Sequence, residues 1–330
     1  MDSPETEKRS EVFAVVPSYN HGPFVEKCLR SIIAQTLPPK KLLVIDDGST
    51  DGSPAIIERV LNECPFDCEL ISRQNRGLCT TLNEAFALSD GDYFAYLGSD
   101  DLWLPNFLRE QTRLLNDRPH AVLAFSHAYV IDEHDRITDS TDKWTEFADG
   151  DLRPLLLRGV VFSSPGVLYR RQALAQFHWN EDARLEDYEM YLKLSGIGEF
   201  ARNPKILSAW RRHGVNASTN LPTMFPEMIA AQDRVASDLG ISPDELRSTQ
   251  TQMKFAAAEN FVRHGFRRSA AKLFLENLGG ASSISQIVST AFRLAIPESL
   301  FRWNRRRKQD RAIQEMGSLD DVMKAGSDQR

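Results

Sequence analysis

Two pairs of adjacent carboxylates stand where the chain could hold a metal ion and a phosphate. Asp46 and Asp47 follow one short apolar run, and Asp100 and Asp101 follow another after a Gly-Ser step. Such runs predict strands buried on both faces, and parallel strands deliver their carboxyl ends to one edge of a sheet. Hard divalent cations prefer carboxylate oxygens and often share a phosphate. The pairs therefore predict a cleft for a nucleotide and a divalent cation, although Asp100 and Asp101 could instead cap the next helix.

Other polar residues could act at the same edge. Tyr19 follows the first apolar run and could stack on a base, and one carboxylate of the Asp46-Asp47 pair could accept the N3–H of uracil; the alternatives are a core tyrosine and turn chemistry. Asp187 lies at the start of a helical segment, where it could be a general base or simply favour the helix dipole. His213 could bind a metal or approach a phosphate, although a lone histidine is more often packed or exposed without a role.

The segments expected to carry these residues alternate between strand and helix. Apolar runs predict strands at 12–16, 42–45, 68–71, 93–97 and 121–125, and helical spacing predicts helices at 24–35, 55–61, 78–88 and 105–115. This alternation is typical of an α/β fold with a mostly parallel sheet flanked by helices. The stretch 132–163 is left open between a mobile flap or acceptor-facing segment and an ordinary connection with one packed helix.

After residue 220 the periodicity is helical only. Helices are expected at 224–239 and 244–264, and Ser242 begins an N-cap signal for the second of them. We therefore expect a disordered start at residues 1–10, an α/β domain at 11–220 and an α-helical C-terminal region at 221–330.

Composition limits the classes of protein that the chain could represent. It has 330 residues, 42% of them hydrophobic, and a net charge of −6. No run reaches the roughly 18 apolar residues of a membrane span, and the polar first residues lack a signal-peptide pattern. We expect a cytoplasmic protein with reduced cysteines and, since a uniformly basic surface is not indicated, no nucleic-acid partner.

Taken in order, these segments resemble the inverting glycosyltransferases of family 2, which have the GT-A fold. The resemblance covers about residues 11–220 and rests on six segments: Val15–Asn20, Val44–Asp51, Asn75–Gly77 with Asn83, Ser99–Asp101, Glu186–Asp187, and Trp210–His213 with Asn216 and Ser218. A departure stands at Phe177–Glu181, where the family often has Gly-Gly-Phe. Because that segment often faces the acceptor, the departure leaves the class of acceptor open.

The resemblance implies a role for each matching residue in a catalytic domain at 11–220. Asp187 would deprotonate the acceptor hydroxyl, Asp101 would be the principal metal ligand and His213 a further one, with Mg²⁺ or Mn²⁺ as the cofactor. The nucleotide would be bound by Pro17, Tyr19, Asn20, Asp47, Asn75, Gly77, Asn83, Asp100 and Arg211. No covalent intermediate is then required, since inversion needs only direct attack by the acceptor oxygen.

The same resemblance implies transfer from a nucleotide-sugar donor, with UDP-sugar favoured, to a saccharide or lipid-linked saccharide, as in bacterial cell-surface polysaccharide synthesis. One alternative is a non-catalytic sugar-nucleotide-binding or scaffold protein on this fold. Another is a nucleotidyltransferase, although the loop from Pro17 to Pro23 has a single Gly and no basic residue. Residues 284–311 combine apolar positions with arginines, which fits either attachment to the inner membrane surface or a helix packed on the catalytic domain.

Overall fold

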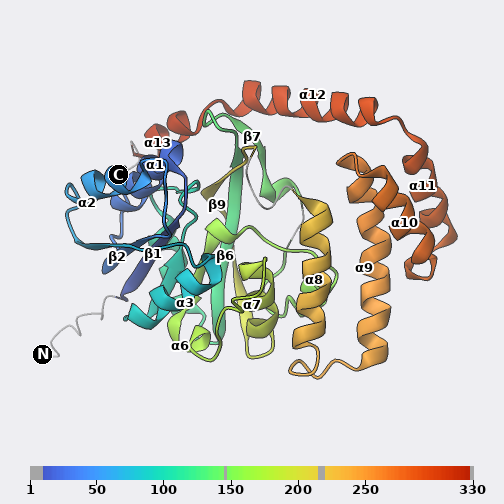
Figure 1. Ribbon diagram of the computed structural model, residues 1–330, viewed down its shortest axis with the longest axis horizontal. Coiled ribbons are helices and arrows are strands. Elements are labelled where there is room, and N and C mark those ends of the chain that lie inside the picture. The colour runs from blue at the N-terminus through green and yellow to red at the C-terminus, as the bar shows by residue number, and fades with distance from the viewer. Residues whose placement is uncertain (1–9, 145–146, 215–219, 328–330) are drawn as a thin grey trace, which may run out of the picture.

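The computed structural model describes residues 10–144, 147–214 and 220–327 (Figure 1). Almost all of the expected disordered start, residues 1–9, lies outside the described residues. The strands are β1 (Val12–Ser18), β2 (Lys41–Asp46), β3 (Asp67–Ser72), β4 (Tyr93–Tyr96), β5 (Leu102–Trp103), β6 (Ala121–Ile131), β7 (Ile137–Ser140), β8 (Val167–Arg170) and β9 (Glu199–Arg211).

The helices cover both faces of the sheet and continue beyond it. They are α1 (Gly22–Ile33), α2 (Ser53–Leu61), α3 (Leu78–Leu88), α4 (Phe107–Asp117), α5 (Arg153–Leu157), α6 (Arg171–Leu174), α7 (Glu186–Ser195), α8 (Leu221–Val235), α9 (Pro243–Arg263), α10 (Arg267–Glu276), α11 (Ile284–Ala295), α12 (Glu298–Met316) and α13 (Leu319–Ser327). Short 3₁₀ turns lie at Thr141–Lys143, Ser164–Gly166 and Leu278–Gly280.

The strands form one sheet in the order β3-β2-β1-β4-β8-β6-β9-β5, with β7 paired to β6. Strands β3, β2, β1 and β4 are parallel, as the alternation of elements predicts, and β9 is parallel to β6. Strand β8 is antiparallel to both β4 and β6. The strand direction reverses from β4 to β8 and again from β8 to β6. The carboxyl ends of β1, β2, β4, β6 and β9 therefore all lie at the same edge of the sheet. The expected α/β class is confirmed.

The core lies in two layers on the two faces of the sheet. In β1, Phe13 and Val15 belong to one hydrophobic cluster, while Val12, Ala14 and Val16 belong to the other. This division follows from the period of two in a strand, whose neighbouring side chains point to opposite faces. Because both faces are buried, β1 has a continuous apolar run, and this run is why the strand could be predicted from the sequence.

Two segments were difficult to predict from their residues. Strand β9 was not predicted, and its Pro204 falls in a register shift between Asn203 and Ile206, where a missing backbone donor is tolerated. In the stretch 132–163, β7 pairs with β6, and α5 buries Leu156 and Leu157. The described part of this stretch is therefore a connection with one packed helix, and residues 145–146 lie outside the described residues.

The C-terminal helices extend away from the sheet and then return to it (Figure 1). Helix α8 packs on α7 and contributes Ala231 and Val235 to the main core. Helix α12 runs back across the top of the molecule toward α13 and contacts β7. There, Gly317 O accepts a hydrogen bond from Ile137 N at 3.1 Å, and Asp135 O accepts one from Leu319 N at 2.9 Å. Among the described helices, none is long and apolar enough to cross a bilayer.

Candidate functional site

Three side chains from three strand ends meet at the carboxyl edge of the sheet. His21 follows β1, Asp100 follows β4, and His213 follows β9. One ligand atom from each lies within 4.8 Å of the other two. The Asp100 Oδ2 atom is 3.0 Å from His213 Nε2, and its Oδ1 atom is 3.8 Å from His21 Nδ1. The group was assembled from segments far apart in sequence, and His21 was not predicted to belong to it.

The chemistry of this donor set fits a divalent cation. Burial lowers the pKa of His21 against the opposing charge of Asp100, which favours the neutral imidazole that can bind a metal. One carboxylate with two imidazoles suits Mn²⁺ better than Mg²⁺, because Mg²⁺ prefers all-oxygen ligands. Ser99 Oγ lies 2.8 Å from His21 Nδ1 and holds the ring in place. We name His21, Asp100 and His213 the metal-site group.

Asp101, expected to be the principal ligand, faces inward. Its side chain is buried, and Oδ1 accepts a hydrogen bond from Arg211 N at 2.8 Å. Burial, together with the charge of Asp100, raises its pKa well above the usual range. Because Asp101 is buried and bonded to Arg211 N, its role as a ligand stays a prediction.

Arg211 lies beneath the site instead of on its open surface. Its side chain is 1% exposed; Nε donates to Asp100 O at 2.8 Å, and Nη1 pairs with Asp135 Oδ1 at 2.6 Å. The guanidinium also lies 4.8 Å from the ring centre of Phe24, which packs against His213. Arg211 therefore positions the Asp100 turn, and a direct contact with a nucleotide stays a prediction. Asn216 and Ser218 of the same motif lie outside the described residues.

The loops after β1 and β2 are joined to each other. Asn20 has a φ of 53°. Its backbone N donates to Ser49 Oγ at 2.8 Å, and its side-chain Oδ1 accepts from Thr50 N at 2.8 Å. Tyr19 beside it is 49% exposed, so its ring is open to a ligand and is not a core residue. Pro17 lies within β1 opposite Ile45. Asn20 thus cross-links the loops after β1 and β2, next to the exposed Tyr19.

Asp47 uses both carboxylate oxygens to organise the loop after β3. Oδ1 accepts from Arg76 N at 2.9 Å and pairs with the Arg73 guanidinium, while Oδ2 accepts from Gly77 N at 2.8 Å. A carboxylate has about four lone-pair sites, so one acceptor position remains for a base. Asn75, in the same loop, is exposed. These contacts lie within the protein, so the nucleotide-binding roles of Asp47, Asn75 and Gly77 stay predictions.

Asn83, expected to bind the nucleotide, bonds to the segment that contains Trp179. Its Nδ2 donates to Trp179 O at 2.9 Å and its Oδ1 accepts from Trp179 N at 2.9 Å. These bonds hold the Phe177–Glu181 segment against α3, where residues from both line a cavity of about 490 Å³. Asn83 therefore shapes a cavity wall, and its contact with a nucleotide stays a prediction.

Glu186 and Asp187 begin α7, as predicted, and have unusual acidity. Burial raises the pKa of Asp187 to about 6. Burial and the charge of Asp187 together raise the pKa of Glu186 to about 8. The charge of Glu186 also contributes to the raised pKa of Asp101, so the acidic pair and the Asp100 turn lie in one electrostatic neighbourhood. A carboxylate that titrates near neutrality is well matched to general base catalysis.

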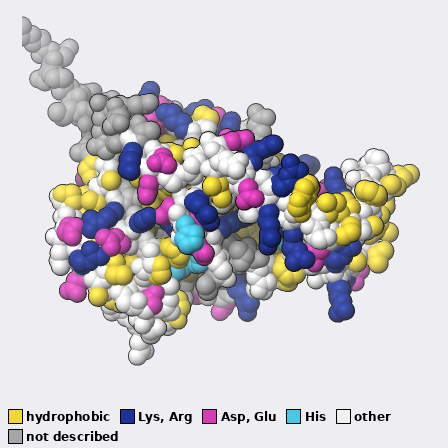
Figure 2. All heavy atoms as spheres, turned by 90° about the horizontal axis from the view of Figure 1, so that it is seen from above, with side chains coloured by type: hydrophobic (Ala, Val, Ile, Leu, Met, Phe, Trp, Pro, Cys, Tyr) yellow, Lys and Arg dark blue, Asp and Glu magenta, His cyan; other side chains and the backbone are white. Residues whose placement is uncertain are grey.

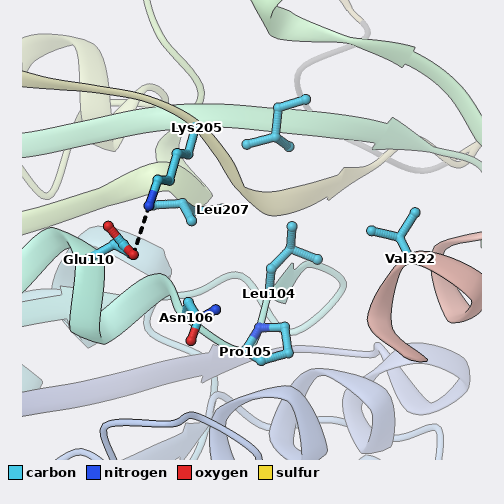
Figure 3. Close-up of a pocket in the computed structure, with 8 residues that line it drawn as sticks. Leu104, Pro105, Asn106, Glu110, Lys205, Leu207 and Val322 are labelled. Carbon is cyan, nitrogen blue, oxygen red and sulfur yellow. Dashed lines mark ion pairs between the residues drawn. The ribbon is translucent and has the colours of Figure 1, made fainter. Parts of the chain in front are cut away.

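A second cavity, of about 300 Å³, lies between α4, β9 and α13 (Figure 3). Leu104, Leu207 and Val322 make its lining mostly apolar, and Lys205 pairs with Glu110 across one side at 2.8 Å. None of the lining residues belongs to the metal-site group or to the acidic pair. It therefore has no part in the candidate site.

Comparison with known families decides the relationship. Residues 13–177 match the model described as "Glycosyl transferase family 2". The chain belongs to this family. The match spans the loops that carry His21 and Asp100 and the sheet up to β8, and the resemblance read from the sequence motifs is confirmed. As a family 2 glycosyltransferase, the chain carries its acidic pair and His213 beyond the matched segment.

The curated relatives of this family 2 chain are distant. A chondroitin synthase of Pasteurella multocida is 26% identical over 63% of this chain and 21% of its own length. A chondroitin synthase of Escherichia coli is 27% identical over 62% of this chain and 29% of its own length. An uncharacterized glycosyltransferase of Nostoc sp. is 27% identical over 50% of this chain and 52% of its own length. The chain thus spans about half, or less, of these relatives.

Solved structures share the fold of this family 2 chain. A mannosyltransferase from Pyrobaculum calidifontis, in complex with GDP-Man and Mn²⁺, superposes with a TM-score of 0.61 at 18% identity, covering 95% of this chain and 88% of the other. S. aureus TarS 1–349, in complex with UDP-GlcNAc, superposes with a TM-score of 0.59 at 14% identity, covering 89% and 92%. At such low identity these likenesses establish the GT-A fold alone.

Proposed function

We propose that the protein is a metal-dependent inverting glycosyltransferase that moves a sugar from a nucleotide-sugar donor to a hydroxyl of a saccharide or lipid-linked saccharide. The observation that carries the proposal is the convergence of two groups at one sheet edge. The metal-site group offers a cation position, and the Glu186-Asp187 pair offers a carboxylate that titrates near neutrality. Direct transfer needs both a stabilised diphosphate and a base, and needs no covalent nucleophile.

Each part of the site then has a task. Tyr19 stacks on the base of the donor, and Asp47 receives a base N–H while holding the loop that contains Gly77. Asp187 takes the proton from the attacking acceptor hydroxyl, and Glu186 keeps its own proton at neutral pH because of its higher pKa. A divalent cation held by the metal-site group would offset the charge that builds on the departing diphosphate. Arg211 keeps the Asp100 turn in position from below.

The donor and the acceptor are proposed at different levels of detail. The fold neighbours include one complex with UDP-GlcNAc and one with GDP-Man and Mn²⁺, so we propose a nucleoside-diphosphate sugar, with UDP-sugar first and Mn²⁺ as the favoured cation. The distant relationship to chondroitin synthases supports a saccharide acceptor and a role in polysaccharide synthesis. The cavity beside Trp179, adjacent to the acidic pair in sequence, is the proposed acceptor side.

Calorimetric titration tests the proposal directly. UDP and GDP would be titrated with and without Mn²⁺ into the wild type, Asp100→Asn and Asp187→Asn, and diphosphate release from UDP- and GDP-sugars would be followed with oligosaccharide acceptors. We expect Mn²⁺-dependent binding that Asp100→Asn weakens and Asp187→Asn preserves, with turnover lost in both. Binding without transfer for every donor and acceptor would favour the scaffold alternative, and release of pyrophosphate from a nucleoside triphosphate would favour a nucleotidyltransferase.

A further inference from the structure

The face of α11 that points away from the protein is apolar. Ile284, Val288 and Phe292 are 80%, 62% and 70% exposed. Their spacing of four residues puts them in one stripe along the helix. The opposite side of α11 is packed against the protein, since Ile287 and Leu294 join a hydrophobic cluster with Phe255 of α9 and Phe274 of α10. The helix is therefore held by one face and leaves the other uncovered.

The next helix also exposes apolar side chains, and it adds charge. Leu300 and Trp303 of α12 are 51% and 53% exposed, and the Arg307 guanidinium lies 4.7 Å from the Trp303 ring centre. Arg306 and Lys308 are exposed as well, and no ion pair within the described part of the chain involves Arg306, Arg307 or Lys308. Seen from above, hydrophobic side chains gather beside Lys and Arg side chains on the lobe of C-terminal helices (Figure 2).

We propose that this face, made of Ile284, Val288, Phe292, Leu300 and Trp303 and called here the docking face, lies on an anionic lipid bilayer. An amphipathic helix with an uncovered apolar stripe and adjacent arginines binds at the membrane interface, and tryptophan favours the level of the headgroups. No helix is needed to cross the bilayer, in keeping with the short apolar segments. The inference depends on the surface alone and not on the transfer reaction proposed above.

Charge favours a bilayer over a second copy of the chain as the occupant. In a two-fold dimer the same patch meets itself, so Arg306, Arg307 and Lys308 would approach their own copies. An anionic lipid surface instead attracts such residues, strengthening binding by roughly fivefold for each one near the surface. Helix α11 carries Arg293 as its single charged residue, and on α12 the carboxylates of Glu298 and Glu315 pair with Arg302 and Arg311.

The test is sedimentation of the full chain with vesicles of phosphatidylcholine alone or mixed with phosphatidylglycerol. We expect binding to the anionic vesicles that weakens with salt, falls more than tenfold in Phe292→Glu, and falls up to about a hundredfold when Arg306, Arg307 and Lys308 are changed to Gln. Leu88→Glu is the matched control, because Leu88 is 54% exposed on α3 and should leave binding unchanged. Both positions are on the surface, so folding should be retained.

Each other outcome overturns the inference. Wild-type protein that stays in the supernatant, or Phe292→Glu and Leu88→Glu variants that bind equally well, would exclude the docking face. A dimer in sedimentation velocity that Phe292→Glu converts to a monomer, without vesicle binding, would assign the face to a second copy. Mn²⁺-dependent nucleotide binding, measured on the same samples, reports separately on the proposed function.

Discussion

Replacing Asp187 by Asn should make the protein more stable at pH 8 while removing its activity. The carboxyl of Asp187 is costly to ionise in its site, as shown by a pKa raised from the usual 3.8 to about 6. An acid whose pKa is raised by folding keeps its proton longer in the folded chain than in the unfolded chain. Stability is therefore lost as the pH rises from about 4 to about 6, and it stays lower above that window.

The magnitude follows from the same rise. A change from 3.8 to about 6 corresponds to about 3 kcal/mol, which is an upper limit because Asp187 is partly exposed. The charge of Asp187 also raises the pKa of Glu186, so its removal relieves both groups in the same direction. The amide of Asn can still accept the 2.6 Å hydrogen bond from Tyr188 N, which keeps the local geometry.

Urea unfolding at pH 5 and pH 8 measures the effect. At pH 8 the free energy of unfolding of Asp187→Asn should exceed that of the wild type by about 2 kcal/mol, within a range of about 1–3 kcal/mol. At pH 5 the difference should be about half as large. Asp182→Asn, at a nearby exposed aspartate, should show no such pH-dependent gain. Turnover of Asp187→Asn should fall by about 10² to 10⁴. A variant no more stable than wild type at pH 8, or equally stabilised at both pH values, would refute the burial argument.

Three other predictions concern the same edge of the sheet. His21→Ala should weaken Mn²⁺ binding by about 10-fold or more in calorimetry, as His213→Ala should; if Mn²⁺ binds His21→Ala as tightly as wild type, His21 is no ligand. Asp47→Ala removes two backbone hydrogen bonds and an arginine partner, so the unfolding free energy should fall by about 2–3 kcal/mol in urea titration, and an unchanged midpoint would contradict the assigned contacts. Below about pH 6, kcat/KM should fall about tenfold per pH unit, because Asp187 becomes protonated. If the residual activity of Asp187→Asn still fell in this way at acid pH, another residue would be the base.

The part of the fold built from doubly buried parallel strands was predictable. Strands β1, β2 and β4 each contain a continuous apolar run because each is covered on both faces, and the helices between them have clear periodicity. Strand β9 was not predicted, because Pro204 interrupts it and because its partner β6 lies far away in sequence. Helical periodicity does not report such long-range pairing, so the strand that delivers His213 was invisible even though the histidine itself was recognised.

The chemistry of the site was predictable by residue type, but its contacts were not. Asp100 was found because it follows a predicted strand, Asp187 because it begins a predicted helix, and His213 because it ends the Trp210–His213 motif. His21 was missed, since a single histidine in a loop has no periodic signal, although its place after the first strand could have suggested the same edge. Nothing in the sequence shows that Asp47 is engaged with the following loop, because these contacts depend on backbone positions.

Asp135 ties the far end of the chain to the loop that bears Asp100. Its side chain pairs with Lys27 of α1 and with Arg211, which bonds to Asp100 O, while its backbone O receives the hydrogen bond from Leu319. A shortened chain that ends near residue 220 would lose Leu319 and expose the apolar surface beneath α13. Protein engineers who trim the molecule to its α/β part should therefore expect to disturb the candidate site as well, which makes the C-terminal helices a poor place for truncation.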